Sequence, residues 1–592
     1  MAIARGSTVV LIPSCLILLG IGCINAKSTG GKPAGGTGGA TASGGTHATG
    51  GVTSSGGSSA TGGSSGTGGA KSTGGTTGSG GAQATGGTTA SGGSSATGGA
   101  PATGGTQSSG GSSGSGGAKA SGSTTGAGGK TTTGGSAGSG GTTGTGGTSA
   151  SGGSIGTGSC SITVSTSSTS AKMATVGIVE WSTTLTNLTS AQIVYTLNNA
   201  GSSVLNQGGT APVDLTKTNY HTLLLGLKPS STYTFHIEAT ANGTTCKSDD
   251  KTLTTGTLSG APSVTRTATN ASAQAKGFII TSGGVTSSGG AGTGQAYIID
   301  ADGTVVWTAA APASCSRARM DYEGANMWMM ALNVMNSGGE MRYVSMDGAT
   351  TMNNVNGLSM SHHDFTVLKG GVIATMVWSS SGSDVQSDLV ERSASGTVKT
   401  VFHIGSNLYN GGQSLFGAGS NTYHCNSLLY HATDDSYTIG DRNPNLYVKV
   451  THAGSPVWQF GGSCSSAPAP KCASGSWTSN HGHHLLDNGN FLLFSNGTYG
   501  STSSPSSAYE YTLSTSGTMS ATQVKAYKSS SNSHSDSLGD VQRLPNGNTL
   551  VTFSNNGLLQ ELDSSWNVVQ TLSTGSFGYA DWRETLYGPP PR

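Results

Sequence analysis

The stretch Asn480-His481-Gly482-His483-His484-Leu485-Leu486-Asp487-Asn488-Gly489-Asn490-Phe491-Leu492-Leu493-Phe494 reads as two strands joined by a tight turn. Asn-Gly between two such runs is a strong local signal for a β-hairpin. The pattern recurs, with a histidine or glycine five residues before the leucine that precedes each turn, at His363, His424, His481 and Gly539. Their spacings are 61, 57 and 58 residues (424−363, 481−424 and 539−481). This near-constant period predicts a β-propeller with one blade per repeat.

A second repeat indicates the number of blades. Short turn phrases of the type Asp302-Gly303-Thr304 recur along the chain, beginning at Asp302, Asp347, Ser395, Ala453, Ser516 and Asp563. We interpret each as the turn between the two outer strands of a blade. Six turns predict an all-β, six-bladed β-propeller over residues 274–592, with the C-terminal segment closing onto the first blade.

The first 158 residues have the composition of an export signal and a tether. Arg5 and the apolar run over residues 9–21 predict a signal segment too short to span a membrane as a stable helix. Gly20-Ile21-Gly22-Cys23 is similar to a bacterial lipobox, so residues 1–23 predict membrane attachment through a lipidated Cys23, with simple cleavage near Ala26 as the alternative. Residues 24–158 are rich in Gly, Ser and Thr and predict a disordered linker. We therefore expect an exported protein, either a lipoprotein of the outer membrane or cell surface or a periplasmic protein.

Residues 159–257 read as a β-sandwich that precedes the propeller. Trp181 fits a buried core tryptophan, and Leu227-Lys228-Pro229-Ser230-Ser231-Thr232-Tyr233 resembles the fibronectin type III phrase whose tyrosine forms a tyrosine corner. Cys160 and Cys246 lie near the two ends of this unit and could pair. The unit has no catalytic constellation, and we interpret it as a spacer.

The charge and the cysteine content of the chain argue against several classes of function. The net charge of +1, with only 9% charged residues, gives no argument for nucleic acid as a partner. Cys464 and Cys472 flank a short loop and predict a local disulfide, whereas the pairing of Cys315 and Cys425 stays open. No Cys-x-x-Cys occurs, which argues against a structural zinc site of that kind. Cys425 lies beside His424, but without a visible base a buried or disulfide-bonded thiol is the better interpretation than a nucleophile.

Three successive repeats carry a histidine at the equivalent position, and equivalent positions face one axis. His363, His424 and His481 are therefore expected to converge at one mouth of the central channel, with Asn426 and Arg442 beside them. Taken singly, each histidine fits a polar residue at an inner edge of the propeller.

Other polar residues of the repeats fit the candidate site less well. His483 and His484 lie further along their strand than His481, and His431 and His534 are out of register and expected at the surface. Arg317 and Arg319 precede an earlier hairpin, where the register does not decide whether they line the channel.

These phrases together resemble the bacterial aryl-sulfate sulfotransferase family. The resemblance rests on His362-His363-Asp364-Phe365, on His424-Cys425-Asn426-Ser427 followed by Arg442 eighteen residues after His424, on His481 before its hairpin, and on the ending from Tyr579 to Tyr587. Asn480 departs from the pattern, because a glutamine is common there. The resemblance covers the propeller only, and implies an exported six-bladed propeller that moves sulfate from an aryl sulfate donor to a phenolic acceptor without a cofactor. It places a transiently sulfated histidine at His481 and supporting roles at His363, His424, Asn426 and Arg442.

The chemistry of sulfuryl transfer fits these residue types. The reaction needs a nucleophile, an acid for the leaving phenolate and donors around the sulfate oxygens. Neutral imidazoles supply the first two, and Arg442 supplies a planar fork of donors. The sequence has no phosphate-cradling Gly-x-x-x-x-Gly-Lys-Ser/Thr loop, so a nucleotide donor is not expected. Two alternatives stay open, namely a non-catalytic cell-surface binding or adhesion propeller, and a metal site held by the three imidazoles.

Overall fold

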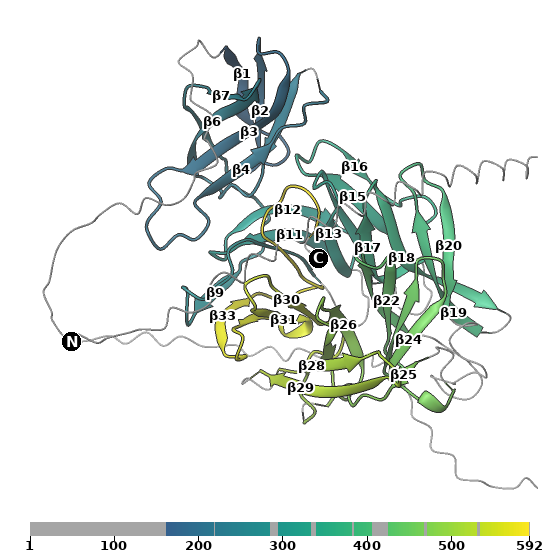
Figure 1. Ribbon diagram of the computed structural model, residues 1–592. Coiled ribbons are helices and arrows are strands. Elements are labelled where there is room, and N and C mark those ends of the chain that lie inside the picture. The colour runs from purple at the N-terminus through teal and green to yellow at the C-terminus, as the bar shows by residue number, and fades with distance from the viewer. Residues whose placement is uncertain are drawn as a thin grey trace, which may run out of the picture. The chain divides into compact units, whose positions relative to one another are not determined.

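The computed structural model describes residues 161–217, 219–284, 294–332, 339–381, 384–404, 424–466, 471–501, 503–529 and 533–590. These residues form strands, turns and two short 3-10 helices (Figure 1). Our predictions of an export signal, a lipidated Cys23 and a disordered linker, and the Cys160 half of a predicted disulfide, lie outside the described residues. In the described ranges, no helix has the length and apolar character needed to cross a membrane.

The first described unit is a sandwich of two antiparallel sheets. One sheet has the order β1 (Ile162–Thr169), β2 (Gly177–Thr183), β5 (Tyr220–Leu224). The other has the order β4 (Gly208–Pro212), β3 (Leu188–Leu197), β6 (Thr232–Ala241), β7 (Thr244–Lys247), and β8 (Lys251–Thr254) also pairs with β6. Alternate residues of β6 are buried, as expected for strands with one face on a core.

Two sequence signals of the sandwich have structural counterparts. Trp181 is buried against Tyr220, with ring centroids 4.4 Å apart. The Lys228 backbone N–H donates to the Tyr233 hydroxyl at 2.8 Å, the geometry of a tyrosine corner. Cys246 is disulfide-bonded.

The second unit is the predicted propeller, built of six sheets of four or five strands. Each blade takes its strands from one stretch of chain, apart from the two closing strands. The strands, blade by blade, are β10 (Phe278–Gly283), β11 (Gly294–Asp300), β12 (Val305–Ala311); β13 (Cys315–Met320), β14 (Asn326–Ala331), β15 (Met341–Ser345), β16 (Thr351–Met352); β17 (Ser361–Leu368), β18 (Val372–Ser381), β19 (Asp384–Arg392), β20 (Val398–His403); β21 (Cys425–His431), β22 (Ser436–Asp441), β23 (Leu446–Thr451), β24 (Pro456–Gly461), β25 (Cys472–Ala473); β26 (Asn480–Leu485), β27 (Asn490–Ser495), β28 (Ser507–Ser514), β29 (Ser520–Lys528); and β30 (Asp540–Arg543), β31 (Thr549–Phe553), β32 (Leu558–Leu562), β33 (Val568–Ser573).

The ring closes at both ends of the propeller chain. The C-terminal β34 (Asp581–Arg583) pairs with β10 and so becomes the innermost strand of the first blade. At the other end β9 (Thr265–Ala268) pairs with β33 as the outermost strand of the last blade. The strand pairing of the propeller therefore begins before residue 274, where the sequence placed its start. Closure of the C-terminal segment onto the first blade agrees with the sequence-based expectation.

All six predicted turns join the third and fourth strands of a blade, counted from the channel, and in two blades a fifth strand, β25 or β9, lies outside them. Five of them contain a glycine in the left-handed region, for example Gly303 at φ 82° and Gly396 at φ 94°. The sixth turn has Trp566 at φ 65° instead, a strained conformation for a residue with a side chain. The repeated turn was visible in the sequence because the backbone geometry demands glycine at most of these positions.

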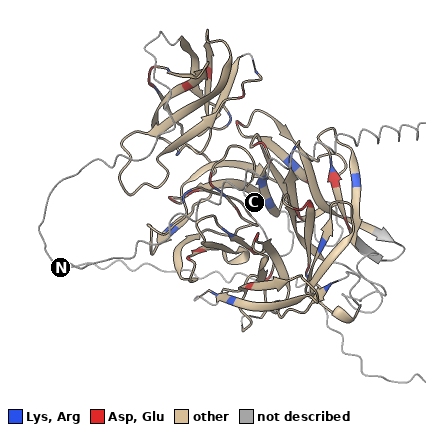
Figure 2. Ribbon diagram, viewed as in Figure 1, with Lys and Arg blue, Asp and Glu red and all other residues tan. Residues whose placement is uncertain are grey.

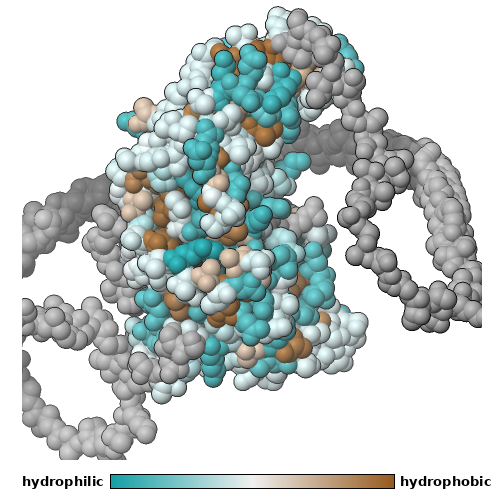
Figure 3. Space-filling model, turned by 90° about the vertical axis from the view of Figure 1, so that its left-hand side faces the viewer, coloured by the Kyte–Doolittle hydropathy of each residue, from teal (hydrophilic) through white to brown (hydrophobic). Residues whose placement is uncertain are grey.

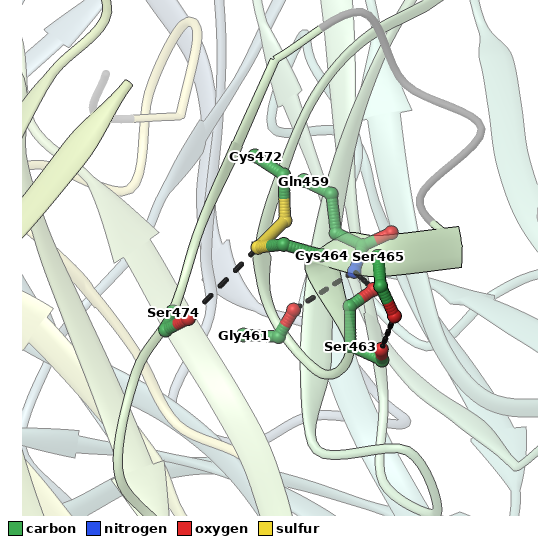
Figure 4. The surroundings of a disulfide bond; sticks show 7 residues. All are labelled: Gln459, Gly461, Ser463, Cys464, Ser465, Cys472 and Ser474. Carbon is green, nitrogen blue, oxygen red and sulfur yellow. Dashed lines mark hydrogen bonds between the residues drawn. A yellow bond between two sulfur atoms is a disulfide. The ribbon is translucent and has the colours of Figure 1, made fainter. Parts of the chain in front are cut away.

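Apolar side chains fill the space between neighbouring blades, and charged residues are sparse over the described strands (Figure 2). The face shown in Figure 3 mixes hydrophilic and hydrophobic residues. The predicted disulfide between Cys464 and Cys472 is present, with their Cα atoms 5.6 Å apart, and it closes the loop between β24 and β25 (Figure 4). Cys315 and Cys425 are free and buried.

Candidate active site

A β-bulge at the start of an inner strand builds each part of the site. The pairing register shifts between Ser361 and Phe365 in β17, between Cys425 and Ser427 in β21, and between Asn480 and His483 in β26. A bulge redirects side chains and interrupts the backbone hydrogen bonds between the paired strands. In β17 the bulge holds His363 at φ 63°, in the left-handed region that residues with a side chain seldom adopt. The three predicted histidines thus lie at the same ends of three successive inner strands.

Two of these histidines are in direct contact. His424 Nε2 and His363 Nε2 are 3.1 Å apart, and the ring centroids are 4.8 Å apart in an edge-on arrangement. His363 is buried, whereas His424 is partly exposed. The backbone N–H of His424 donates to Asp441 at the end of β22, which fixes the start of the strand that carries it.

His481 is buried, and Asn496 orients its ring. Its Nδ1 hydrogen-bonds the Asn496 Oδ1 atom. Asn496 in turn donates its amide Nδ2 to the carbonyls of Ser535, at 2.6 Å, and Leu538, at 2.8 Å. Because both carbonyls can only accept, the amide orientation is fixed and Oδ1 must face the imidazole. In the neutral ring the proton therefore lies on Nδ1, and the lone pair lies on Nε2.

Gly482 explains how closely the His481 strand approaches the next blade. Its N–H donates to Gly539 O at 3.0 Å, and a Cβ atom at this position would lie 2.0 Å from an Asp540 carboxylate oxygen. Only glycine fits between the bulge and β30.

The electrostatics of the site favour neutral imidazoles. Burial, and after it the charge of Arg442, lowers the pKa of His363 to about 3. Burial first, with Arg442 among the further causes, also holds the pKa values of His424 and His481 well below the ordinary range. Arg442 follows β22, is partly exposed, and its backbone N–H donates to His424 O at 3.0 Å. The site therefore combines neutral imidazole rings with the nearby positive charge of Arg442.

Asn426 is close to the site but is completely buried. Its amide Nδ2 donates to the Asn480 carbonyl at 2.7 Å, which ties the fourth blade to the residue before His481. Its carbonyl Oδ1 is buried without a hydrogen-bond partner among the described residues. The Asn426 backbone carbonyl accepts a hydrogen bond from the buried Tyr579 hydroxyl at 2.5 Å. These contacts favour a positioning role for Asn426, to which the resemblance gave an unspecified supporting role.

His483 and His484 do not belong to the site. His483 hydrogen-bonds Ser427 at 2.9 Å and Thr438 at 2.6 Å, and the His484 Nδ1 accepts the Arg543 N–H at 3.0 Å. His484 instead lines a cavity of about 210 Å³ near the other ends of the inner strands, which supports ranking it below His481.

Two expectations about surface histidines were wrong. His431 is half-buried and lines this same cavity, with burial lowering its pKa to about 3. His534 is also half-buried, and its ring contacts the Ser504 carbonyl at 3.0 Å and Asp536 at 2.7 Å. They are out of register because His431 lies at the end of β21 and His534 lies in the loop before β30.

Arg317 and Arg319, which the sequence left undecided, form a charged centre in the propeller. Arg317 bonds Asp364 at 2.8 Å, and it bonds Asp540 and Asp581 at 3.0 Å each. These partners come from β17, β30 and β34, so one buried guanidinium on β13 joins four blades. Arg319 pairs with Asp581 as well. The Arg317 guanidinium also lies over the ring of Tyr579, 4.4 Å from its centroid.

Sequence reasoning missed Asn496 and the pairing of His362 with His363. Asn496 directly follows the second strand of its blade, and Arg442 directly follows the second strand of the preceding blade. Because Arg442 was already a candidate, a comparison of the residue that follows the second strand in each repeat would also have pointed to Asn496. In the part of the chain that the structure describes, no group of three or more His, Cys, Asp or Glu side chains is arranged to hold a metal ion.

The fold and the site define a β-propeller whose centre presents neutral imidazoles and an arginine, a combination suited to transfer of an anionic group. The chain belongs to the arylsulfotransferase (ASST) family, whose model matches residues 263–576, more than half of its length. This family assignment supports a sulfotransferase function that uses aryl sulfate donors and phenol acceptors. No curated protein matches the chain.

The solved structures that resemble this chain have low sequence identity and low structural similarity to it. A protein of unknown function from Bacteroides caccae is 14% identical, with a TM-score of 0.34, over 52% of this chain and 100% of that one. A streptogramin B lyase is 10% identical, with a TM-score of 0.31, over 54% and 98%. The β-propeller domain of the Trilobed protease from Pyrococcus furiosus is 7% identical, with a TM-score of 0.25, over 73% and 100%. Likenesses of this size carry no argument about function.

Proposed function

We propose that this protein is an exported aryl-sulfate sulfotransferase that works through a sulfohistidine at His481 and uses no nucleotide. The observation that carries the proposal is the state of His481. Its Nδ1 is bonded to a fixed carbonyl oxygen of Asn496, so the lone pair of the neutral ring is on Nε2. A buried, neutral and oriented imidazole near a cationic Arg442 is equipped to attack an anionic sulfate ester.

The reaction takes place in two displacements. The Nε2 lone pair of His481 forms a bond to sulfur, and the electrons of the breaking S–O bond leave on the phenolate oxygen. Arg442 stabilises the sulfate oxygens, and His424 donates a proton to the phenolate. The oxygen of the acceptor phenol then attacks the same sulfur while its proton passes to His424, the S–N bond breaks, and His481 regains its lone pair. His363 positions His424 through the bond between their Nε2 atoms, and Asn426 positions the strand before His481.

Export is proposed from the sequence. Arg5, the apolar run over residues 9–21 and the lipobox-like Gly20-Ile21-Gly22-Cys23 favour secretion with attachment through Cys23. The disulfide between Cys464 and Cys472 is consistent with an oxidising compartment.

The test is a burst experiment without an acceptor. Wild-type protein mixed with excess 4-nitrophenyl sulfate should release about one nitrophenol per site and then slow. The protein should carry one acid-labile sulfate, and fragmentation must assign it to His481 and not to His483 or His484 on the same peptide. His481→Asn should lose both burst and label. His483→Asn is the matched control, because His483 lies on the same strand and is buried outside the site.

The alternative, a non-catalytic binding function, predicts a different result. A non-catalytic propeller would bind aryl sulfates without releasing phenol, and His481→Asn would bind them equally well. That pair of results would refute the transferase and leave a binding protein.

A further inference from the structure

A continuous chain of hydrogen bonds leads away from the candidate site into the third blade. Ser387 Oγ on β19 lies 3.0 Å from His362 Nε2, and His362 Nδ1 lies 3.0 Å from His363 Nδ1. His363 Nε2 lies 3.1 Å from His424 Nε2. Ser387, His362 and His363 are buried, and only His424 at the far end is partly exposed. This chain of hydrogen bonds therefore begins in the protein interior at Ser387 and ends in the candidate site at His424.

Such a chain can carry a proton. A neutral imidazole has one donor nitrogen and one acceptor nitrogen, so the bonds between neighbouring rings must all point the same way. Moving each proton to the next nitrogen reverses every bond and delivers one proton from one end to the other. Both ring nitrogens of His362 and of His363 are used in this way.

His362 is the ring in this chain best placed to hold a positive charge. The indole of Trp378 stacks on it, with centroids 4.0 Å apart and an interplanar angle of 22°, and the π-face of tryptophan attracts a cation. Ser387 supplies an acceptor for its Nε2–H. The charge of Arg442 lowers the pKa values of His363 and His424, whereas at His362 the lowering comes from burial and from His363.

The groups that face His362 are His363 on its own strand, Trp378 on β18, Ser387 on β19 and, on β21, the Cys425 backbone, which hydrogen-bonds the ring. The Cys425 thiol lies 3.7 Å from the carboxylate of Asp441. No cation other than the histidines is among them in the described residues, so a proton at His362 meets less repulsion than one beside Arg442.

We propose that His362 stores the proton that the leaving phenolate receives and that the acceptor phenol later returns, with His363 and His424 conducting it. The inference rests on the proposed function for its chemistry. The proton enters from water when an anionic substrate occupies the site, because the added negative charge offsets the repulsion and the desolvation that keep the chain neutral without substrate.

The protons balance over the cycle. With the stored proton, His362 donates from both nitrogens, His363 donates to His424, and His424 Nδ1–H faces the ester oxygen. As the S–O bond breaks, the phenolate takes the Nδ1 proton, the His363 Nε2 proton moves to His424, and the His362 Nδ1 proton moves to His363. His424 Nδ1 is then a lone pair. It accepts the proton of the acceptor phenol, and the same shifts in reverse reload His362.

The decisive experiment measures proton uptake without catalysis. A 4-substituted benzenesulfonate has an S–C bond in place of the ester bond and cannot transfer its sulfonate group. Its binding is followed by calorimetry in two buffers of different ionisation enthalpy near pH 7.5. Wild-type protein should take up about one proton per bound anion. His362→Asn should bind the anion within a few fold but take up none, because an asparagine Nδ2 still donates to His363 yet cannot be protonated. His484→Asn, a buried histidine outside the site, should behave as wild type.

A kinetic readout separates storage from a structural role. In the burst phase without an acceptor, His362→Asn should release 4-nitrophenol at close to the wild-type rate, because that phenolate leaves without help. It should release phenol from unsubstituted phenyl sulfate about 100-fold more slowly. Equal losses on both esters, or unchanged proton uptake in His362→Asn, would overturn the proposal, and so would a failure of the sulfonate to bind. Uptake through His362 in a protein that never releases phenol would support the proton store and refute the transferase.

Discussion

The orientation of His481 by Asn496 gives the most direct test of the site. Asn496→Leu removes the acceptor of the Nδ1–H bond and keeps a side chain of similar size. Leaving a buried donor unsatisfied costs about 1–3 kcal/mol. At about 1.4 kcal/mol per factor of ten, this corresponds to a loss of about 5- to 140-fold in kcat/KM. The loss should lie toward the upper end, because the ring gains positive charge as the S–N bond forms and a charge-assisted bond is the stronger one.

The assay is phenol release from 4-nitrophenyl sulfate, with burst amplitude and thermal unfolding measured on the same samples. Asn496 also anchors the Ser535 and Leu538 carbonyls, so loss of the loop must be separated from loss of ring orientation. Ser506→Ala is the matched control. Its hydroxyl donates to Asn496 O at 2.9 Å and accepts from Ser535 N at 2.8 Å, but it does not touch the imidazole. A folded Asn496→Leu protein with wild-type kcat/KM, or an equal loss in Ser506→Ala, would refute the reasoning.

The structure makes four further predictions. First, kcat/KM for 4-nitrophenyl sulfate should not decrease as pH falls through 6.5, because burial and Arg442 hold the pKa of His481 well below its ordinary value. Arg442→Gln should lower the rate about 100-fold or more and move the acid limb to higher pH, whereas Arg442→Lys should lose rate but keep the limb low. A decrease in the wild type with an inflection near 6.5 would contradict this. Second, Arg317→Met should lower the free energy of unfolding in urea by about 3–5 kcal/mol, since it leaves the buried carboxylates of Asp364 and Asp540 without this cation. Arg342→Met, which loses a partly exposed pair with Glu340 and a bond to the Ala310 carbonyl, should cost about 1 kcal/mol. Third, His484 has a folded-state pKa of about 4, below that of the unfolded chain, so the stability it contributes is complete above pH 6.5 and is lost as pH falls toward 4; His484→Asn should therefore remove about 2 kcal/mol of the decrease in unfolding free energy between pH 7 and 5. Fourth, dialysed protein should contain no stoichiometric zinc or copper by elemental analysis and should keep its activity with chelator; bound metal lost together with activity would favour the metal alternative.

The sequence revealed the propeller because its signals are local and repeated. Turns that need a positive φ select glycine, and the Asn-Gly hairpin and the blade period follow from strand geometry. The period also placed His363, His424 and His481 at equivalent strand ends, and the structure brings these ends together. Their roles in catalysis stay predictions, as does the export of the chain.

The parts that the sequence did not reveal depend on bulges and on long-range pairing. A bulge adds residues to a strand without changing its composition, so the reorientation of His362 and His363 leaves no periodic signal. Arg317 finds partners 47, 223 and 264 residues away. Asn496 acts through one hydrogen bond to a ring fifteen residues earlier. None of these contacts can be read from a hydrophobic pattern, because they are made by polar atoms that meet only when the ring closes.

Closure of the ring also explains why the histidines are neutral. Tyr579, which precedes β34, and Arg317 on β13 fill the centre of the propeller together with three carboxylates, and Tyr579 reaches the Asn426 carbonyl beside the site. Its ring lies 6.4 Å from that of His481. Burial is the largest cause of the lowered pKa at His363, His424 and His481. The charged centre ties four blades together beside the imidazoles, so the same contacts that hold the blades together help to bury these rings and to keep them unprotonated.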